Sequence, residues 1–343
     1  MLIKKKEIAL LLIFLSLVVT NLFAENYYFK RYDKENGLSQ QTVFCAVQDR
    51  RGFLWFGTKV GLNRFDGTKF KNYVADPEQP NSLPNNTVLA LAEAPDGSLW
   101  LGTSDGLCIY NPEKDTFAPF VSADLTIEGL IDNLVFDKQG NLWVINSKGI
   151  YCLDVKNGNH KFFPASDFFV PTGIAVTQSG SVWVLGLDGN IYLFNPQRME
   201  FSSYPILTKE EKTKHILLYR ILECSNGDLV VTTDRIGARR FSPNNGEVKV
   251  LFSNDSQNNP IYIHTAIQRN KDEFWFGTES GIHIYQLDLG FIDHLQKSYN
   301  DAYSLSDNAV HMLLKDREEG IWVGTFFGGV NYLSNNNTLF DKY

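Results

Sequence analysis

The sequence predicts an all-β protein, a seven-bladed β-propeller built from four-stranded antiparallel blades. Two observations lead to this prediction. All six tryptophans of the 343-residue chain lie on one lattice with a period of about 45 residues, and around each of them a short apolar run and two Gly-containing turns recur. Four short strands in a unit of this length are typical of a propeller blade.

The tryptophan lattice fixes the number of blades. Its positions are Trp55, Trp100, Trp143, Trp183, Val230, Trp275 and Trp322, with Val230 at the midpoint of the only double-length gap. Seven copies predict seven blades within residues 25–339. Aromatic faces also suit stacking on sugars, but recurrence at one strand position favours packing of these indoles in the blade cores.

The elements of each copy follow one order. An inner strand, such as residues 88–92, precedes a Gly turn, and the tryptophan strand, a second Gly turn and a third strand follow. A Phe-x-x-aromatic segment closes the unit, at residues 70–73, 117–120 and 201–204. An extra copy at residues 29–32 is placed to pair with the seventh blade and to remove an exposed edge, but a second extra copy stands at the C-terminus, and the spacing does not decide which of the two closes the ring. Residues 340–343 are a further copy, interpreted as the start of a linker or outer strand toward a missing second propeller.

The N-terminus predicts export. Three lysines at residues 4–6, an apolar run over 8–19 and Ala24 indicate a signal peptide over residues 1–24 and a periplasmic location, with an uncleaved anchor as the alternative. No second membrane span is expected in the mature chain. The net charge of −7 argues against a nucleic-acid partner. Four cysteines without a C-x-x-C pair argue against a disulfide scaffold or a zinc ribbon.

The Gly-x-Leu/Ile-Trp-x-Gly-Thr core resembles the two-component regulator propeller repeat. Residues 55–58, 100–103, 275–278 and 322–325 match it best, whereas Ile145, Leu185 and Val230 depart from it. The resemblance covers residues 27–343. It implies the N-terminal periplasmic sensor propeller of a Bacteroidetes hybrid two-component system, truncated after the first propeller.

The same resemblance implies partners and ligands. In that family a second propeller and a β-sandwich precede a membrane helix, a kinase and a receiver, a homodimer is expected, and the usual ligands are oligosaccharides. Because the kinase region is absent from this chain, we expect neither enzymatic activity nor a cofactor here.

Candidate binding residues lie in the turns between second and third strands. These turns share one propeller face with the loops that enter the inner strands, and their residues differ from blade to blade. A mixed charged and aromatic rim suits hydrogen bonding and stacking to a sugar, although solvated loops look equally charged. The candidates are Lys59, Asp105, Lys148, Asp188, Asp234, Arg235, Glu279, Phe326 and Phe327.

A second set lies in the inner strands, eleven residues before each tryptophan position. Its members are Phe44, Leu89, Asp132, Thr172, Tyr219, His264 and His311. Of these, Tyr219, His264 and His311 are candidate ligand contacts, and the two histidines of adjacent blades are placed to meet. The sequence indicates no carboxylate or third ligand beside them, so we predict structural histidines and no metal site.

Three functions are compatible with this interpretation of the sequence. The first is a non-enzymatic recognition module that senses a glycan fragment. The second is an exported propeller hydrolase or lyase acting on polysaccharide, for which the sequence shows no interpretable carboxylate pair. The third is a scaffold that binds nothing small and serves dimerisation. The first is favoured.

Overall fold

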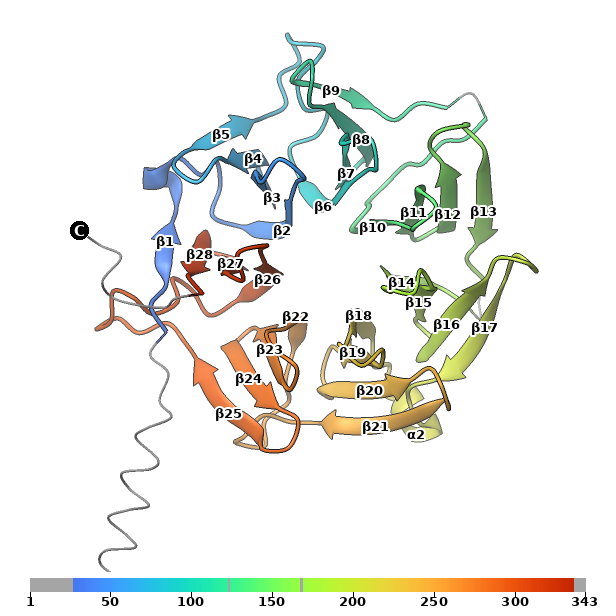
Figure 1. Cartoon of the computed structure of the whole chain (residues 1–343), viewed down its shortest axis with the longest axis vertical. Helices are drawn as coiled ribbons and strands as arrows, with labels where there is room; N and C mark the ends of the chain where they lie inside the picture. Colours follow the sequence, from blue (N-terminus) through green and yellow to red (C-terminus); the bar gives the residue numbers. More distant parts are fainter. Residues whose placement is uncertain (1–26, 123, 167–168, 336–343) are drawn as a thin grey trace, which may run out of the picture.

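Seven four-stranded antiparallel sheets are arranged radially around one axis in the computed structural model, which describes residues 27–122, 124–166 and 169–335 (Figure 1). This confirms the predicted seven-bladed propeller. The predicted signal peptide over 1–24 and the segment 340–343 lie outside the described residues. Across the described residues, no helix is long and apolar enough to cross a membrane.

Each blade runs outward from an inner strand next to the axis (Figure 1). The inner strands are β2 (Val43–Gln48), β6 (Val88–Glu93), β10 (Asn133–Phe136), β14 (Pro171–Val176), β18 (Leu218–Glu223), β22 (Ile263–Gln268) and β26 (Val310–Lys315). The second strands, which carry the tryptophan lattice, are β3 (Leu54–Thr58), β7 (Leu99–Thr103), β11 (Asn141–Asn146), β15 (Val182–Gly186), β19 (Leu229–Thr233), β23 (Glu273–Thr278) and β27 (Ile321–Thr325).

Third and outer strands complete the blades, and only short helices accompany them. The third strands are β4 (Gly61–Phe65), β8 (Gly106–Asn111), β12 (Gly149–Asp154), β16 (Asn190–Asn195), β20 (Ala238–Ser242), β24 (Gly281–Gln286) and β28 (Val330–Leu333). The outer strands are β5 (Phe70–Tyr73), β9 (Thr116–Pro119), β13 (His160–Pro164), β17 (Glu200–Pro205), β21 (Glu247–Phe252), β25 (Gly290–Leu295) and β1 (Lys30–Tyr32). Within residues 27–335, leaving out 123 and 167–168, the helical segments are η1 (Lys34–Asn36) and α2 (Lys209–Lys212).

The ring is closed by the N-terminal strand. β1 pairs antiparallel with β28, with Lys30 opposite Tyr332, and so supplies the outer strand of blade 7, which is one of the two alternatives that the sequence left open. The Arg31 guanidinium also donates to the carbonyl oxygen of Ser304 at 2.8–3.0 Å. Phe29 is 2% exposed. Strand pairing, ion-dipole contacts and apolar burial therefore all hold this junction.

The glycine of the Trp-x-Gly-Thr segment allows close packing between blades. A Cβ atom on Gly57 would lie 2.8 Å from Val88 Cγ1 in the next inner strand, and one on Gly277 would lie 2.6 Å from Val310 Cγ1. Any side chain at these positions would force the inner strands apart. In blades 3–5, buried Ile145, Leu185 and Thr232 occupy the equivalent positions.

The threonine that follows caps the turn between the second and third strands. Thr58 Oγ1 donates to the carbonyl of Gly61 at 2.8 Å and accepts the backbone N–H of Val60 at 3.2 Å. Thr103 and Thr278 donate in the same way to the glycine that opens the third strand. These bonds fix the backbone from which the candidate turn residues project.

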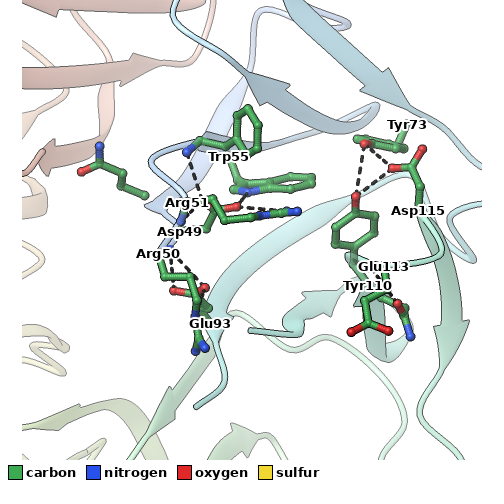
Figure 2. Close-up of polar contacts among 12 residues, drawn as sticks. Asp49, Arg50, Arg51, Trp55, Tyr73, Glu93, Tyr110, Glu113 and Asp115 are labelled. Atoms are coloured by element: carbon green, nitrogen blue, oxygen red, sulfur yellow. Dashed lines mark hydrogen bonds and ion pairs between the residues drawn. The ribbon is translucent and has the colours of Figure 1, made fainter. Parts of the chain in front are cut away.

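Several tryptophans are anchored by a carboxylate placed six residues earlier. Asp49 Oδ2 accepts the indole N–H of Trp55 at 2.9 Å (Figure 2), while its Oδ1 accepts the backbone N–H groups of Arg51 and Phe53. The same arrangement recurs as Asp137 with Trp143 and as Asp316 with Trp322. One carboxylate therefore ties the first turn of a blade to its core. All six indoles are at most 5% exposed.

Neighbouring blades are also joined at the ends of their inner strands. The Glu93 carboxylate accepts the backbone N–H of Arg50 in the preceding blade and pairs with its guanidinium at 2.9 Å (Figure 2). The same link recurs between other blades, where a side-chain oxygen at the end of an inner strand accepts a backbone N–H from the neighbouring blade. The acceptors and their donors are Gln48 with Arg317, Glu223 with Gln178, and Gln268 with Ser225.

A further link joins the outer parts of blades 1 and 2. The hydroxyl groups of Tyr73 and Tyr110 both donate to Asp115 Oδ1 at 2.7 Å (Figure 2), and Lys71 pairs with its other oxygen. Burial favours a higher pKa for Asp115, but Lys71 and the two hydroxyl groups outweigh burial and lower the pKa to about 2.

One turn differs from the sequence interpretation. The sequence aligns Gly328 with the glycines six residues after each tryptophan, but the positive φ of 75° in blade 7 belongs to Gly329. The turn is one residue longer there, because Thr325 caps it through the carbonyl of Gly329. Phe326 in this turn is half-buried, whereas Phe327 is exposed.

The carboxylate–indole anchor predicts a large effect of one substitution. Asp137→Ala leaves the Trp143 indole N–H and the N–H groups of Gln139 and Asn141 without their acceptor, so we expect a loss of about 2–4 kcal/mol in unfolding free energy, measured in urea. The matched control is Asp66→Ala, which removes a turn acceptor of Thr68 and Lys69 on the exposed surface. A control loss as large as that of Asp137→Ala would contradict the anchor.

Candidate functional site

Six of the seven inner strands contain a β-bulge at the position that the sequence singled out. The register against the second strand shifts there, which leaves one residue of the inner strand unpaired. Bulges redirect side chains and are frequent beside functional sites. The unpaired residues, named here the bulge ring, are Phe44, Leu89, Thr172, Tyr219, His264 and His311. In blade 3 the equivalent Asp132 immediately precedes β10 and is exposed.

The bulge ring lies at the same end of the blades as the turns between second and third strands. Backbone N–H groups in these turns donate to the residue that precedes each inner strand, as Lys59 does to Thr42 and Phe326 to Ala309. Asp234 does the same to Leu217. The two sets of predicted residues therefore share one face of the propeller, named here the bulge face.

A continuous row of rings crosses blades 5, 6 and 7 on the bulge face. Tyr219 meets His264 edge to face at 6.0 Å between ring centroids, and His264 stacks on His311 at 4.3 Å with an interplanar angle of 11°. Phe326 packs on His311 at 5.2 Å and contacts Phe327, which is 69% exposed. The row ends in an aromatic surface open to solvent.

A carboxylate lies beside the two histidines, contrary to the expectation that they have none. Glu279, in the turn after β23, has its Oε1 2.6 Å from His264 Nε2 and 3.9 Å from His311 Nε2. Sequence spacing does not indicate the approach to His311, because Glu279 reaches there from blade 6 into blade 7. Burial and the neighbouring His264 ring lower the pKa of His311 to about 4.

Arg220, which the sequence interpretation missed, joins three blades at the centre of the ring. Its guanidinium donates to Asn133 Oδ1 in blade 3 at 3.0 Å and to the carbonyl oxygen of His264 in blade 6 at 3.3 Å. It also lies over the Tyr219 ring at 5.2 Å. The only signal in the sequence was its place directly after a candidate inner-strand residue.

The remaining predicted turn residues do not join this cluster. Asp188 accepts the Tyr192 hydroxyl at 2.6 Å. Asp234 accepts the backbone N–H of Leu217 and pairs with Arg235 at 3.1 Å. These contacts are local to blades 4 and 5. Arg235 is exposed, as are Lys59, Asp105 and Lys148, the last in a loose pair with Glu128 at 3.6 Å.

A second histidine pair lies on the other side of the same turn. His283 is 2% exposed and stacks on His294 at 3.8 Å, and Ser280 contacts both rings, His283 through its hydroxyl and His294 through its carbonyl oxygen. Burial and His294 lower the pKa of His283 to about 4, against the smaller opposite effect of Asp255. Two adjacent turn residues, Glu279 and Ser280, therefore each contact a stacked histidine pair.

Cavities between blades lie elsewhere. One of about 560 Å³ is bordered by Lys71, Tyr73 and Asp115 and by the loop around residues 78–83, and another of about 380 Å³ lies between blades 3 and 4. Neither is lined by a residue of the bulge ring. The Asp115 carboxylate at the first is already engaged by three donors.

Known proteins resemble this chain both in sequence and in structure. Residues 37–59, 82–105 and 304–327 match the family described as two component regulator propeller. A 53-residue stretch is 49% identical to histidine kinase P4 of Formosa agariphila and covers 16% of this chain and 4% of that protein.

Solved structures extend the comparison to nearly the whole ring. The extracellular domain of a putative hybrid two component system from B. thetaiotaomicron is 26% identical with a TM-score of 0.75, over 90% of this chain and 42% of that one. This chain therefore spans about two fifths of its length. Virginiamycin B lyase from Staphylococcus aureus has a TM-score of 0.69 at 12% identity, over 90% and 99% of the two chains, which shows a shared fold alone.

The buried His283 predicts a pH-dependent stability. Its pKa of about 4 in the folded protein lies below the unfolded value of about 6.5, so the unfolded chain binds more protons between these values and stability falls as the pH decreases. From pH 6.5 to 5, His283 contributes a loss of about 1 kcal/mol per pH unit to the unfolding free energy, because the unfolded imidazole is only half protonated at pH 6.5. Urea unfolding at several pH values should show a shallower dependence for His283→Gln. The exposed His160→Gln serves as control, and equal slopes for wild type and His283→Gln would refute the assignment.

Proposed function

The chain carries two-component regulator propeller repeats, and we propose that it is the exported sensor propeller of a hybrid two-component system. It recognises an oligosaccharide on the bulge face, without enzymatic activity, and it acts in the periplasm. The sequence relationship to a histidine kinase and the 26% identity to an extracellular hybrid-system domain support the sensor assignment.

The observation that carries the ligand proposal is the row of rings on the bulge face. Exposed aromatic faces such as Phe327 suit the C–H faces of a pyranose, and the polar groups of Glu279 and Arg220 lie beside them. A few polar groups among aromatic side chains are the usual composition of a small-molecule site. Blades 5–7 therefore form the proposed binding side, whereas Asp188 and the pair Asp234–Arg235 serve local structure.

Signalling requires the rest of the receptor. In the proposed mechanism, the ligand favours one arrangement of this propeller relative to a second propeller, a β-sandwich and a dimer partner. A ligand shifts such an equilibrium only by its difference in affinity for the two arrangements. The link between blade 3, blade 5 and blade 6 through Arg220 provides a route by which contacts at the centre affect several blades.

Two other functions predict different results. A hydrolase or lyase would release product from polysaccharide, whereas a scaffold would bind no sugar. The likeness to virginiamycin B lyase is a likeness of fold alone. Among the described residues of the bulge face, Glu279 is hydrogen-bonded to His264, and this pairing differs from the two facing carboxyl groups of typical glycosidases.

Calorimetry with a panel of plant and host-glycan oligosaccharides tests the proposal. We expect saturable binding to the wild type, and about tenfold weaker binding for Phe327→Ala and for Tyr219→Ala because each loses a stacking face. The matched control is Phe162→Ala, which removes an aromatic ring that is 39% exposed on β13, the outer strand of blade 3.

Two outcomes would contradict the proposal. New reducing ends or unsaturated products after incubation with polysaccharide would establish an enzyme. Absence of binding to the whole panel, or binding that the Phe327 and Tyr219 variants leave unchanged, would favour a scaffold or a different face.

A further inference from the structure

We propose that His264, Glu279 and His311 form a binding site for one divalent transition-metal ion of the Zn²⁺ class. The proposal stands on the convergence of three ligand groups from three separate elements. It does not depend on the sensor function, because metal binding is measured without any sugar.

The geometry brings the three ligand atoms together at two bulges and a turn. His264 and His311 are the unpaired residues of β22 and β26, and Glu279 follows β23. One ligand atom of each side chain lies within 4.8 Å of the other two. The bulges produce this convergence, because they take both imidazoles out of the regular alternation of their strands.

The donor set selects the class of ion. Two imidazole nitrogens and one carboxylate oxygen are ligands of Zn²⁺ and of neighbouring first-row ions, whereas Ca²⁺ and Mg²⁺ prefer oxygen ligands alone. Three protein ligands leave a fourth tetrahedral position for water or for an oxygen of another molecule. Glu279 is 53% exposed at its side chain, so this position opens to solvent.

Binding requires a small rearrangement of side chains. An ion about 2.0–2.2 Å from each ligand holds the ligand atoms about 3.3 Å apart. The 2.6 Å contact between His264 and Glu279 therefore opens as the ion replaces the shared proton, and the His311 ring turns out of its parallel stack so that its lone pair faces the ion. The exposed Glu279 side chain and the partly exposed imidazoles have room for these rotations.

Charges around the site allow a cation. Glu279 is a ligand, and Asp307 acts electrostatically on His311 and accepts the backbone N–H of Phe327. Arg220 opposes these two carboxylates, but its guanidinium is directed to Asn133 and to the His264 carbonyl. The fixed charges nearest the ion therefore sum to one negative charge before it binds.

The second histidine pair provides an internal control. His283 and His294 are also stacked, but their ring nitrogens contact the hydroxyl and carbonyl oxygens of Ser280 in place of a carboxylate. If the ion bound to any stacked pair of histidines, substitutions at either pair would weaken metal binding. In the proposed site, substitutions at His264 or His311 weaken metal binding, and substitutions at His283 or His294 do not.

Titration of the untagged protein with ZnCl₂ in a calorimeter, and with Co²⁺ followed by visible absorption, tests the site. We expect one ion per chain and at least tenfold weaker binding for His311→Ala and Glu279→Gln. His294→Gln should bind like the wild type. Thermal unfolding without metal checks that each variant is folded.

A spectroscopic measurement on the wild type complements the affinities of the variants. In NMR spectra of the histidine rings, Zn²⁺ should shift the signals of two imidazoles, which the His264→Ala and His311→Ala variants identify, and should leave those of His283 and His294 in place. Absence of saturable binding at one ion per chain would overturn the proposal, as would unchanged affinity in the Glu279 and His311 variants. Loss of sugar binding with metal binding retained would concern the sensor proposal alone.

Discussion

The whole architecture depends on how closely inner strands approach the second strands of neighbouring blades. Seven sheets close around one axis only if each fits against the next. In blades 1, 2, 6 and 7 the glycine of Trp-x-Gly-Thr removes the side chain that would hold them apart, whereas a buried Ile, Leu or Thr fits at this position in blades 3–5. The indole beside it fills the space farther out, and a carboxylate such as Asp49 fixes that indole to the first turn. A single repeated segment thus sets spacing, filling and turn geometry together.

The bulges connect this packing to the proposed function. The segment next to each bulge must remain regular, because it packs against the neighbouring blade. The unpaired residue of the bulge is not part of this regular pairing, so its side chain differs between blades without disturbing the propeller. Examples are Phe44, Thr172 and His311. Variation is thereby concentrated on one face, where the rings of blades 5–7 meet Glu279 and Arg220.

The sequence was sufficient for the periodic features and insufficient for contacts between blades. Blade number and strand order follow from spacing, because every copy obeys the same local rules. Spacing left two terminal copies as candidates for closing the ring, and only the structure shows that residues 30–32 pair with β28. The carboxylate at His311 comes from a turn in another blade, and Arg220 reaches two blades at once, so neither contact has a fixed separation in sequence. Asp188 and Asp234 were predicted as binding residues because the sequence does not reveal whether a carboxylate already accepts hydrogen bonds from its own blade, as both of these do.

Completion of blade 7 by β1 has a consequence for the order of folding. Residues about 300 positions apart must meet before the last sheet has its fourth member, and such distant pairing is slow. During synthesis from the N-terminus, the backbone N–H and C=O groups of β1 therefore stay unpaired until β28, near the C-terminal end of the ring, has been made. An unpaired strand edge can pair with another chain, so late closure prolongs the time during which this edge is open to association.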